Sequence, residues 1–118
     1  TTDDVLLIEG VGGIMVPLWG RKTVCDWMCA LNLPLVLVTG SYVGAISHTL
    51  ASVEVLKYRG LQVAVLAVSE RPFSLAPLDE TVATIERFVN PIKVVAVPRL
   101  DEPDAGQAAF GELAAALL

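Results

Sequence analysis

The stretch "LVLVTGSYVGAISHTLASVEVLKYRGLQVAVLAV", residues 35–68, decides the fold. It begins with an apolar run that Gly40 stops, and it ends with a second apolar run at residues 61–68. Residues 45–58, which lie between these runs, are long enough for a helix, and Gly60 is typical of a helix end. Two buried strands joined by a helix predict a βαβ unit with parallel strands.

The same pattern extends to both sides of this unit. The further elements that we expect are strands at residues 5–8 and 93–97 and helices at residues 24–31, 79–88 and 105–118. Strands that alternate with helices are typical of an α/β fold, so we expect a parallel sheet with flanking helices in a single domain over residues 1–118.

Composition narrows the class of protein. Of the 118 residues 54% are hydrophobic but only 6% aromatic, which favours strands buried on both faces under helices rich in Ala and Leu. The net charge of −5 and the scattered Lys and Arg argue against a nucleic-acid partner.

No apolar run approaches the ~18 residues of a membrane span. Cys25 and Cys29 are expected to be reduced, as in a cytoplasmic protein.

The candidate site is expected at one rim of the sheet. Ligands of parallel α/β proteins bind at the carboxyl ends of the strands. The loops predicted at that rim cover residues 9–13, 40–44, 69–73 and 98–100.

The opening stretch "VLLIEGVGGIMVPLWGRKT", residues 5–23, contains glycines but no nucleotide-binding fingerprint. The phosphate-binding loop needs four residues between its glycines, whereas six separate Gly13 from Gly20, and Pro17 lacks an N–H. The dinucleotide motif fails because Met15 stands where its third glycine belongs. A glycine-rich turn that binds no ligand remains an alternative.

Glu9 follows the first predicted strand directly, and three of the next four residues are glycine. A carboxylate in this position can hold Mg²⁺ against phosphate oxygens, because Mg²⁺ takes one or two carboxylates together with phosphate and water. Glycines let the backbone approach a charged ligand closely. The stretch is therefore interpreted as the strand-end acid of a nucleotide enzyme.

The segments "LIEGVGGIMVPL", "GAISHT" and "VPRL" resemble dethiobiotin synthetase from just past its midpoint onward. The motif Glu-Gly-x-Gly alone is weak evidence for this family, because cobyrinate and cobyrate synthases share it. Its combination with Val-Pro-Leu and Gly-Ala-Ile-x-His-Thr is more specific. The resemblance implies a P-loop NTPase-like fold of which this chain is the carboxyl-terminal half.

The family converts 7,8-diaminopelargonate, CO₂ and ATP to dethiobiotin in biotin synthesis, with Mg²⁺, as a homodimer. Its phosphate loop, its second Mg²⁺ carboxylate and the lysines that attend the carbamate belong to the amino-terminal half. The resemblance therefore implies no catalytic residue in this chain, and we expect the chain alone to be inactive.

The resemblance also implies binding residues, with Glu9 as the Mg²⁺ ligand. Those implied for the nucleotide are Glu9, Gly10, Val11, Gly12, Ser69, Glu70, Pro98, Arg99 and Leu100. Those implied for the substrate are Gly13, Val16, Pro17, Gly44, Ala45, Ile46 and Ser47, of which the last four hold the substrate carboxylate across the dimer. An anion at this helix start is physically sensible, because free N–H groups and the positive end of the helix dipole lie there.

The sequence departs from the family at Ser47 and Ser69, where asparagine is common. A hydroxyl makes fewer hydrogen bonds than an amide, so we expect Ser69 to discriminate adenine from other bases less well than asparagine would. Two other functions remain open. One is an ATP-dependent amidation domain like that of cobyrinate or cobyrate synthase, and the other is a non-catalytic relic or regulatory module.

The helix at residues 45–58 predicts a protein partner. Apolar residues occupy much of its circumference, and one small sheet covers only one helix face. We therefore expect a homodimer through this helix, with Ala51 or Val55 facing the partner.

Overall fold

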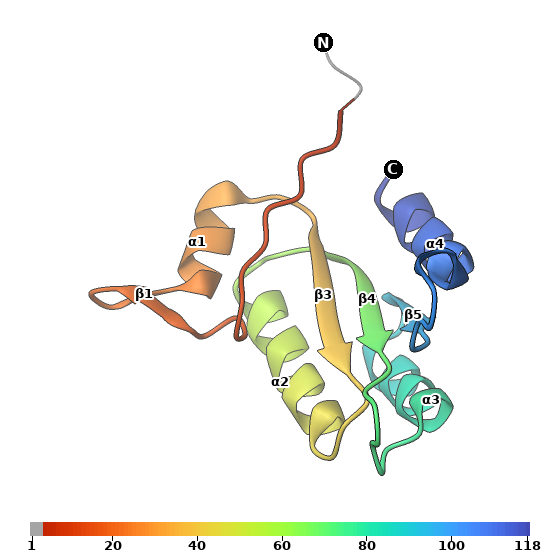
Figure 1. Cartoon of the computed structure of the whole chain (residues 1–118). Coiled ribbons are helices and arrows are strands. Elements are labelled where there is room, and N and C mark those ends of the chain that lie inside the picture. The colour runs from red at the N-terminus through yellow and green to blue at the C-terminus, as the bar shows by residue number, and fades with distance from the viewer. Residues whose placement is uncertain (1–3) are drawn as a thin grey trace. The chain divides into compact units, whose positions relative to one another are not determined.

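The computed structural model describes residues 4–118 (Figure 1). The chain divides into two compact units, Thr1–Asn32 and Leu33–Leu118.

The Leu33–Leu118 unit is built on a parallel sheet. Its strands are β3 (Leu35–Gly40), β4 (Val63–Ser69) and β5 (Lys93–Val97), and they lie in the order β3-β4-β5. Both pairs are parallel, with Gly40 opposite Ser69 and Ser69 opposite Val97. The three strands therefore end at the same rim, and the predicted α/β class with a parallel sheet is confirmed.

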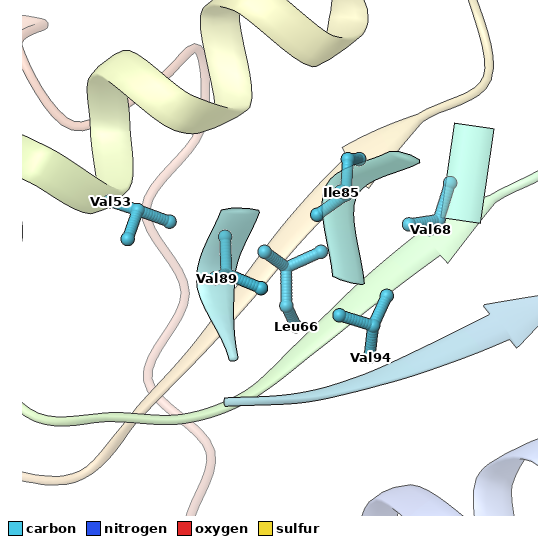
Figure 2. Close-up of a cluster of buried hydrophobic side chains, with 6 residues drawn as sticks. All are labelled: Val53, Leu66, Val68, Ile85, Val89 and Val94. Atoms are coloured by element: carbon cyan, nitrogen blue, oxygen red, sulfur yellow. The ribbon is translucent and has the colours of Figure 1, made fainter. Parts of the chain in front are cut away.

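Helices α2 (Ala45–Tyr58) and α3 (Leu78–Val89) enclose the larger core with the sheet. Figure 2 shows its buried members Val53, Leu66, Val68, Ile85, Val89 and Val94.

The other face of the sheet carries helix α4 (Gln107–Leu117), which follows the short 3₁₀ helix η1 (Pro103–Gly106). Here Val65, Val95 and Ala109 form a second cluster. Because neighbouring side chains of a strand point to opposite faces, β4 is buried on both. On β3, by contrast, Val36 and Val38 remain 37% and 66% exposed.

The strand predicted at residues 61–68 begins two residues later, because Leu61 takes part in the cap that follows α2. Its N–H donates to the carbonyl of Leu56 at 3.0 Å, and the N–H of Gly60 donates to that of Lys57 at 2.9 Å. Gly60 has φ +73°, so these bonds form the glycine-dependent helix cap that the sequence indicated. The helix predicted at 105–118 likewise begins as η1 and continues as α4.

The Thr1–Asn32 unit contains a small antiparallel pair that the sequence reading missed. Strands β1 (Pro17–Trp19) and β2 (Lys22–Thr23) flank Gly20, whose φ is +52°. Helix α1 (Val24–Leu31) follows with the predicted bounds. Thr23 caps it as expected, since its Oγ1 accepts from the N–H of Asp26 and the Asp26 carboxylate accepts from the N–H of Thr23 at 2.8 Å.

The strand predicted at residues 5–8 is wrong. These residues form no strand, and Val5, Leu6 and Leu7 are 62%, 83% and 77% exposed. A strand needs hydrogen bonds from a neighbour, and no strand among residues 4–118 pairs with this segment. The premise that Glu9 leaves a buried strand therefore does not hold within the described chain. No helix in the same residues has the length and hydropathy of a membrane-spanning segment.

Candidate functional site

The candidate site of the larger unit consists of the segments that follow β3, β4 and β5, which we call the rim loops: residues 40–44, 69–73 and 98–100. The parallel register brings their first residues to one edge of the sheet, as predicted. The fourth predicted loop, residues 9–13, belongs to the other unit.

Ser41 joins the first two rim loops. Its N–H donates to the carbonyl of Ser69 at 3.0 Å, and its Oγ accepts from the N–H of Arg71 at 3.0 Å. Ser41 is fully buried, so its own N–H and Oγ are shielded from water. Ser41 was not predicted as a site residue. The signal that was available is a small polar residue placed directly after a strand-ending glycine.

Glu70 joins the second and third rim loops. Its N–H donates to the carbonyl of Val97 at 2.9 Å, and its Oε2 accepts from the N–H of Arg99 at 2.7 Å. Residues predicted to contact the nucleotide are thus also bonded to one another. Leu100 has a packing role as well, because its Cδ1 lies 2.9 Å from where a Cβ on Gly106 would be.

Tyr42, His48 and Arg71 add an aromatic and cationic cluster at the same rim. The Tyr42 hydroxyl lies 3.1 Å from Nδ1 of His48, and the Arg71 guanidinium lies 5.7 Å from the centre of the Tyr42 ring. A Cβ on Gly40 would come within 2.9 Å of Nε of Arg71, so the glycine leaves room for this arrangement. Tyr42 and Arg71 were not predicted as site residues.

Four residues at the start of α2 were predicted to bind the substrate carboxylate, but in its described first turn the backbone N–H groups of only two of them are open to a ligand. The Ala45 side chain is fully buried, and its N–H donates to the carbonyl of Tyr42 at 3.0 Å. The N–H of His48 donates to Gly44 at 3.0 Å. Within residues 4–118, the amides of Ile46 and Ser47 donate no such bond outside the helix. These two amides are therefore the first-turn donors open to an anion.

Local conformation and packing explain why glycines stand at residues 10, 12 and 13. Gly12 and Gly13 have φ of +91° and +114°, a region that disfavours other residues. A Cβ on Gly10 would lie 3.0 Å from Cγ1 of Val24. The glycine-rich turn is thus explained without a ligand, and the same glycines leave its backbone accessible.

Val16 and Pro17, which were predicted to border the substrate, lead into β1. The carbonyl of Val16 accepts from the N–H of Val24 at 2.9 Å, and the carbonyl of Ile14 accepts from Cys25 at 2.7 Å. These bonds fix the segment against the start of α1. Pro17 itself is exposed and pairs with Thr23.

Glu9 is exposed, and among residues 4–118 its carboxylate accepts no hydrogen bond and forms no ion pair. No group of three or more His, Cys, Asp or Glu residues in that part of the chain is arranged to hold a metal ion. This donor set fits a Mg²⁺ ion held mainly by phosphate oxygens and water, with one protein carboxylate, and does not fit a metal held by protein ligands alone.

A cavity of about 460 Å³ lies away from the rim loops. It is at the amino end of β5, because Lys93 is the first residue of that strand. Its lining residues are Glu86, Asn90, Ile92, Lys93, Val94 and Glu112. None of them was predicted as a site residue.

Comparisons with known proteins agree with the fold and with the resemblance. Residues 1–105 match the family model described as AAA domain. The chain is 43% identical over 100 residues to the ATP-dependent dethiobiotin synthetase BioD of Caulobacter vibrioides (strain NA1000 / CB15N), which covers 85% of this chain and 45% of that protein. Identity to the enzyme of the same name from Caulobacter sp. (strain K31) is 38% over 113 residues, or 96% of this chain and 49% of that protein.

The Ralstonia nicotianae (strain ATCC BAA-1114 / GMI1000) enzyme of that name is 37% identical over 109 residues, or 92% of this chain and 48% of that protein. The chain therefore spans about half the length of the curated relatives that it matches. Its P-loop NTPase-like α/β class is supported by both the sheet and the family match. The chain belongs to the AAA domain family, and its resemblance to part of a dethiobiotin synthetase is confirmed.

Proposed function

We propose that this chain is the carboxyl-terminal half of an ATP- and Mg²⁺-dependent dethiobiotin synthetase of the cytoplasm. The complete polypeptide, meaning this chain joined to a segment with the phosphate-binding loop, closes the ureido ring of dethiobiotin from 7,8-diaminopelargonate and CO₂. One amine of the substrate forms a carbamate with CO₂, and ATP phosphorylates this carbamate. The second amine then attacks the carbamate carbon, displaces phosphate and closes the ring. The chain alone is expected not to turn over ATP.

The observation that carries this proposal is the identity of 43% over 85% of the chain to a protein named as an ATP-dependent dethiobiotin synthetase. The rim loops support it independently. They lie at the carboxyl ends of parallel strands, where α/β proteins bind ligands, and hydrogen bonds join them into one surface. We assign the nucleotide to residues 69–70 and 98–100 of this surface and the substrate carboxylate to the amides of Ile46 and Ser47.

We assign Mg²⁺ to Glu9. A carboxylate without another partner in the described chain is available to a metal, and the adjacent glycines leave its backbone accessible to phosphate oxygens. The ion would neutralise charge on the transferring phosphoryl group. Gly10, Val11 and Gly12 are assigned to the phosphates, and Gly13, Val16 and Pro17 to the edge of the substrate site.

We also propose a homodimer through α2, in which Ile46 and Ser47 of one subunit serve the site of the other. The structure modifies the reason given from the sequence. Ile46 and Leu50 pack against the core of their own unit, and the exposed positions of α2 include the polar residues Ser47, His48 and Glu54. The proposal therefore depends on the resemblance and on the open amides of α2, and no longer on a second apolar face.

The test of the function is product formation. The complete polypeptide is incubated with 7,8-diaminopelargonate, bicarbonate and Mg·ATP, and dethiobiotin is detected by mass spectrometry. We expect dethiobiotin together with ADP and phosphate. Amidation of another carboxylate without dethiobiotin would instead indicate a cobyrinate synthase-like domain, and the absence of any ATP turnover would indicate a non-catalytic module.

The dimer is tested by sedimentation of the complete polypeptide with the substitution Ala51→Glu, since Ala51 is an exposed apolar residue of α2. We expect monomers and lost activity together, because a charge at the interface is costly to desolvate. Ala115→Glu, which places the same charge at an exposed position of α4, is the matched control. A monomer with full activity would contradict a site shared between subunits.

A further inference from the structure

The contact between Glu70 and Arg99 has an unusual place in the sheet. In a parallel pair, a residue of one strand donates its N–H to one residue of the neighbour and accepts, on its carbonyl, from the residue two positions further along. The N–H of Glu70 donates to Val97, so the regular partner of the Arg99 N–H would be the Glu70 carbonyl. The Arg99 N–H donates instead to the Glu70 carboxylate, at 2.7 Å.

The side chain of Glu70 thus continues the ladder by one hydrogen bond after the backbones have diverged. Pro98, which lies between the two bonded residues, has no N–H and cannot add another. No further bond between the described backbone of residues 98–100 and β4 or its loop is present. The Glu70 carboxylate therefore makes the one hydrogen bond that joins the described backbone of residues 98–100 to the second rim loop.

From this geometry we infer that Glu70 is a positioning residue, whose carboxylate holds residues 98–100 in the conformation that binds the nucleotide. This inference rests on the proposed function, and it changes the role of Glu70 from a direct contact with the nucleotide to a contact with the loop that binds it. Glu70 is only half-buried, and an N–H bonded to a carboxylate is among the stronger hydrogen bonds of proteins. One acceptor can therefore fix an exposed loop.

Two variants of Glu70 distinguish the geometry of the hydrogen-bond acceptor from its charge. Glu70→Gln keeps an oxygen that can accept the Arg99 N–H, whereas Glu70→Ala removes it. In the complete polypeptide, we expect Glu70→Ala to speed hydrogen exchange of the Arg99 amide about tenfold and to raise the KM for ATP by a similar factor, with kcat unchanged. Glu70→Gln should restore both quantities to within about threefold of the wild type.

Exchange is measured by NMR on the same preparations as the kinetics, with Glu86→Ala as a control at an exposed glutamate of α3. Unchanged exchange of the Arg99 amide in Glu70→Ala would overturn the positioning role. A KM that rises equally in Glu70→Gln and Glu70→Ala would also overturn it, because the nucleotide would then need the charge itself. Faster exchange with an unchanged KM would instead overturn the assignment of the nucleotide to this loop, and with it that part of the proposed function.

Discussion

The rim loops and residues 9–13 were all predicted to line the candidate site, yet they differ in how the structure holds them. Each rim loop follows a strand whose ladder partner is present, and Ser41 and Glu70 add hydrogen bonds between the loops. Residues 4–13 form no helix or strand and are exposed throughout. The comparison teaches that a strand-like sequence specifies a site only where its neighbours in the sheet are also present.

The largest effect should come from the exposed segment. Glu9→Gln in the complete polypeptide is expected to lower Mg·ATP-dependent turnover on the order of a hundredfold or more, because the proposed contact with Mg²⁺ needs the charge of this side chain and not its size. Circular dichroism should be unchanged, since the side chain is exposed. Glu86→Gln on α3 is the matched control. Turnover like the wild type at limiting Mg²⁺ would remove Glu9 from the site.

The next prediction compares the two regions by the same substitution. Leu66→Ala removes a fully buried side chain of the larger core and should lower the free energy of unfolding by about 2–5 kcal/mol. Leu6→Ala removes a side chain that is 83% exposed, and it should change the free energy of unfolding by less than about 0.5 kcal/mol. Denaturant unfolding of the chain measures both. Equal losses would show that Leu6 is buried in solution and would contradict the contrast between the regions.

The sequence predicted best those elements that have strong local signals. Thr23 caps α1 as predicted, and Gly60 ends α2 where expected. The strand at residues 5–8 was predicted from apolar composition alone, and composition does not supply a hydrogen-bonding neighbour. The β1–β2 pair was missed because Gly20 was considered only as part of a phosphate loop.

The candidate site could be predicted only in outline. Its place at the carboxyl ends of β3, β4 and β5 follows from chain order, because parallel strands end at one edge. The bonds of Ser41 and Glu70, and the position of Arg71 over Tyr42, depend on the register between strands distant in sequence. No periodicity encodes that register.

Two glycines, one beside Leu100 of the third rim loop and one within α4, allow a test of how this loop packs. A Cβ on Gly106 would lie 2.5 Å from Phe110 and 2.9 Å from Leu100, so Gly106→Ala should destabilise the chain by about 1–3 kcal/mol. Gly111 lies within α4 and has no atom within 4 Å of its Cβ position, so Gly111→Ala should stabilise it by about 0.5–1 kcal/mol. Thermal unfolding distinguishes them. Shifts of the same sign would show that the side chains of Phe110 and Leu100 are not held against Gly106 as described.

A smaller effect is expected on the choice of nucleotide. The Ser69 side chain is exposed at the end of β4, and a hydroxyl makes fewer base contacts than an amide. We predict weak discrimination among ATP, GTP and CTP, and a gain of about 1–3 kcal/mol in preference for ATP with Ser69→Asn. Ratios of kcat/KM for the three nucleotides measure this. A strong ATP preference in the wild type would show that residue 69 does not read the base.

Photolabelling of the complete polypeptide with 8-azido-ATP tests most directly whether residues 69–70 and 98–100 of the rim loops bind the nucleotide, as we propose. We expect covalent adducts within residues 69–71 and 98–100, and we expect excess ATP to suppress them. Adducts at Glu86, Asn90 or Lys93, around the cavity at the amino end of β5, with none on the rim loops, would contradict it.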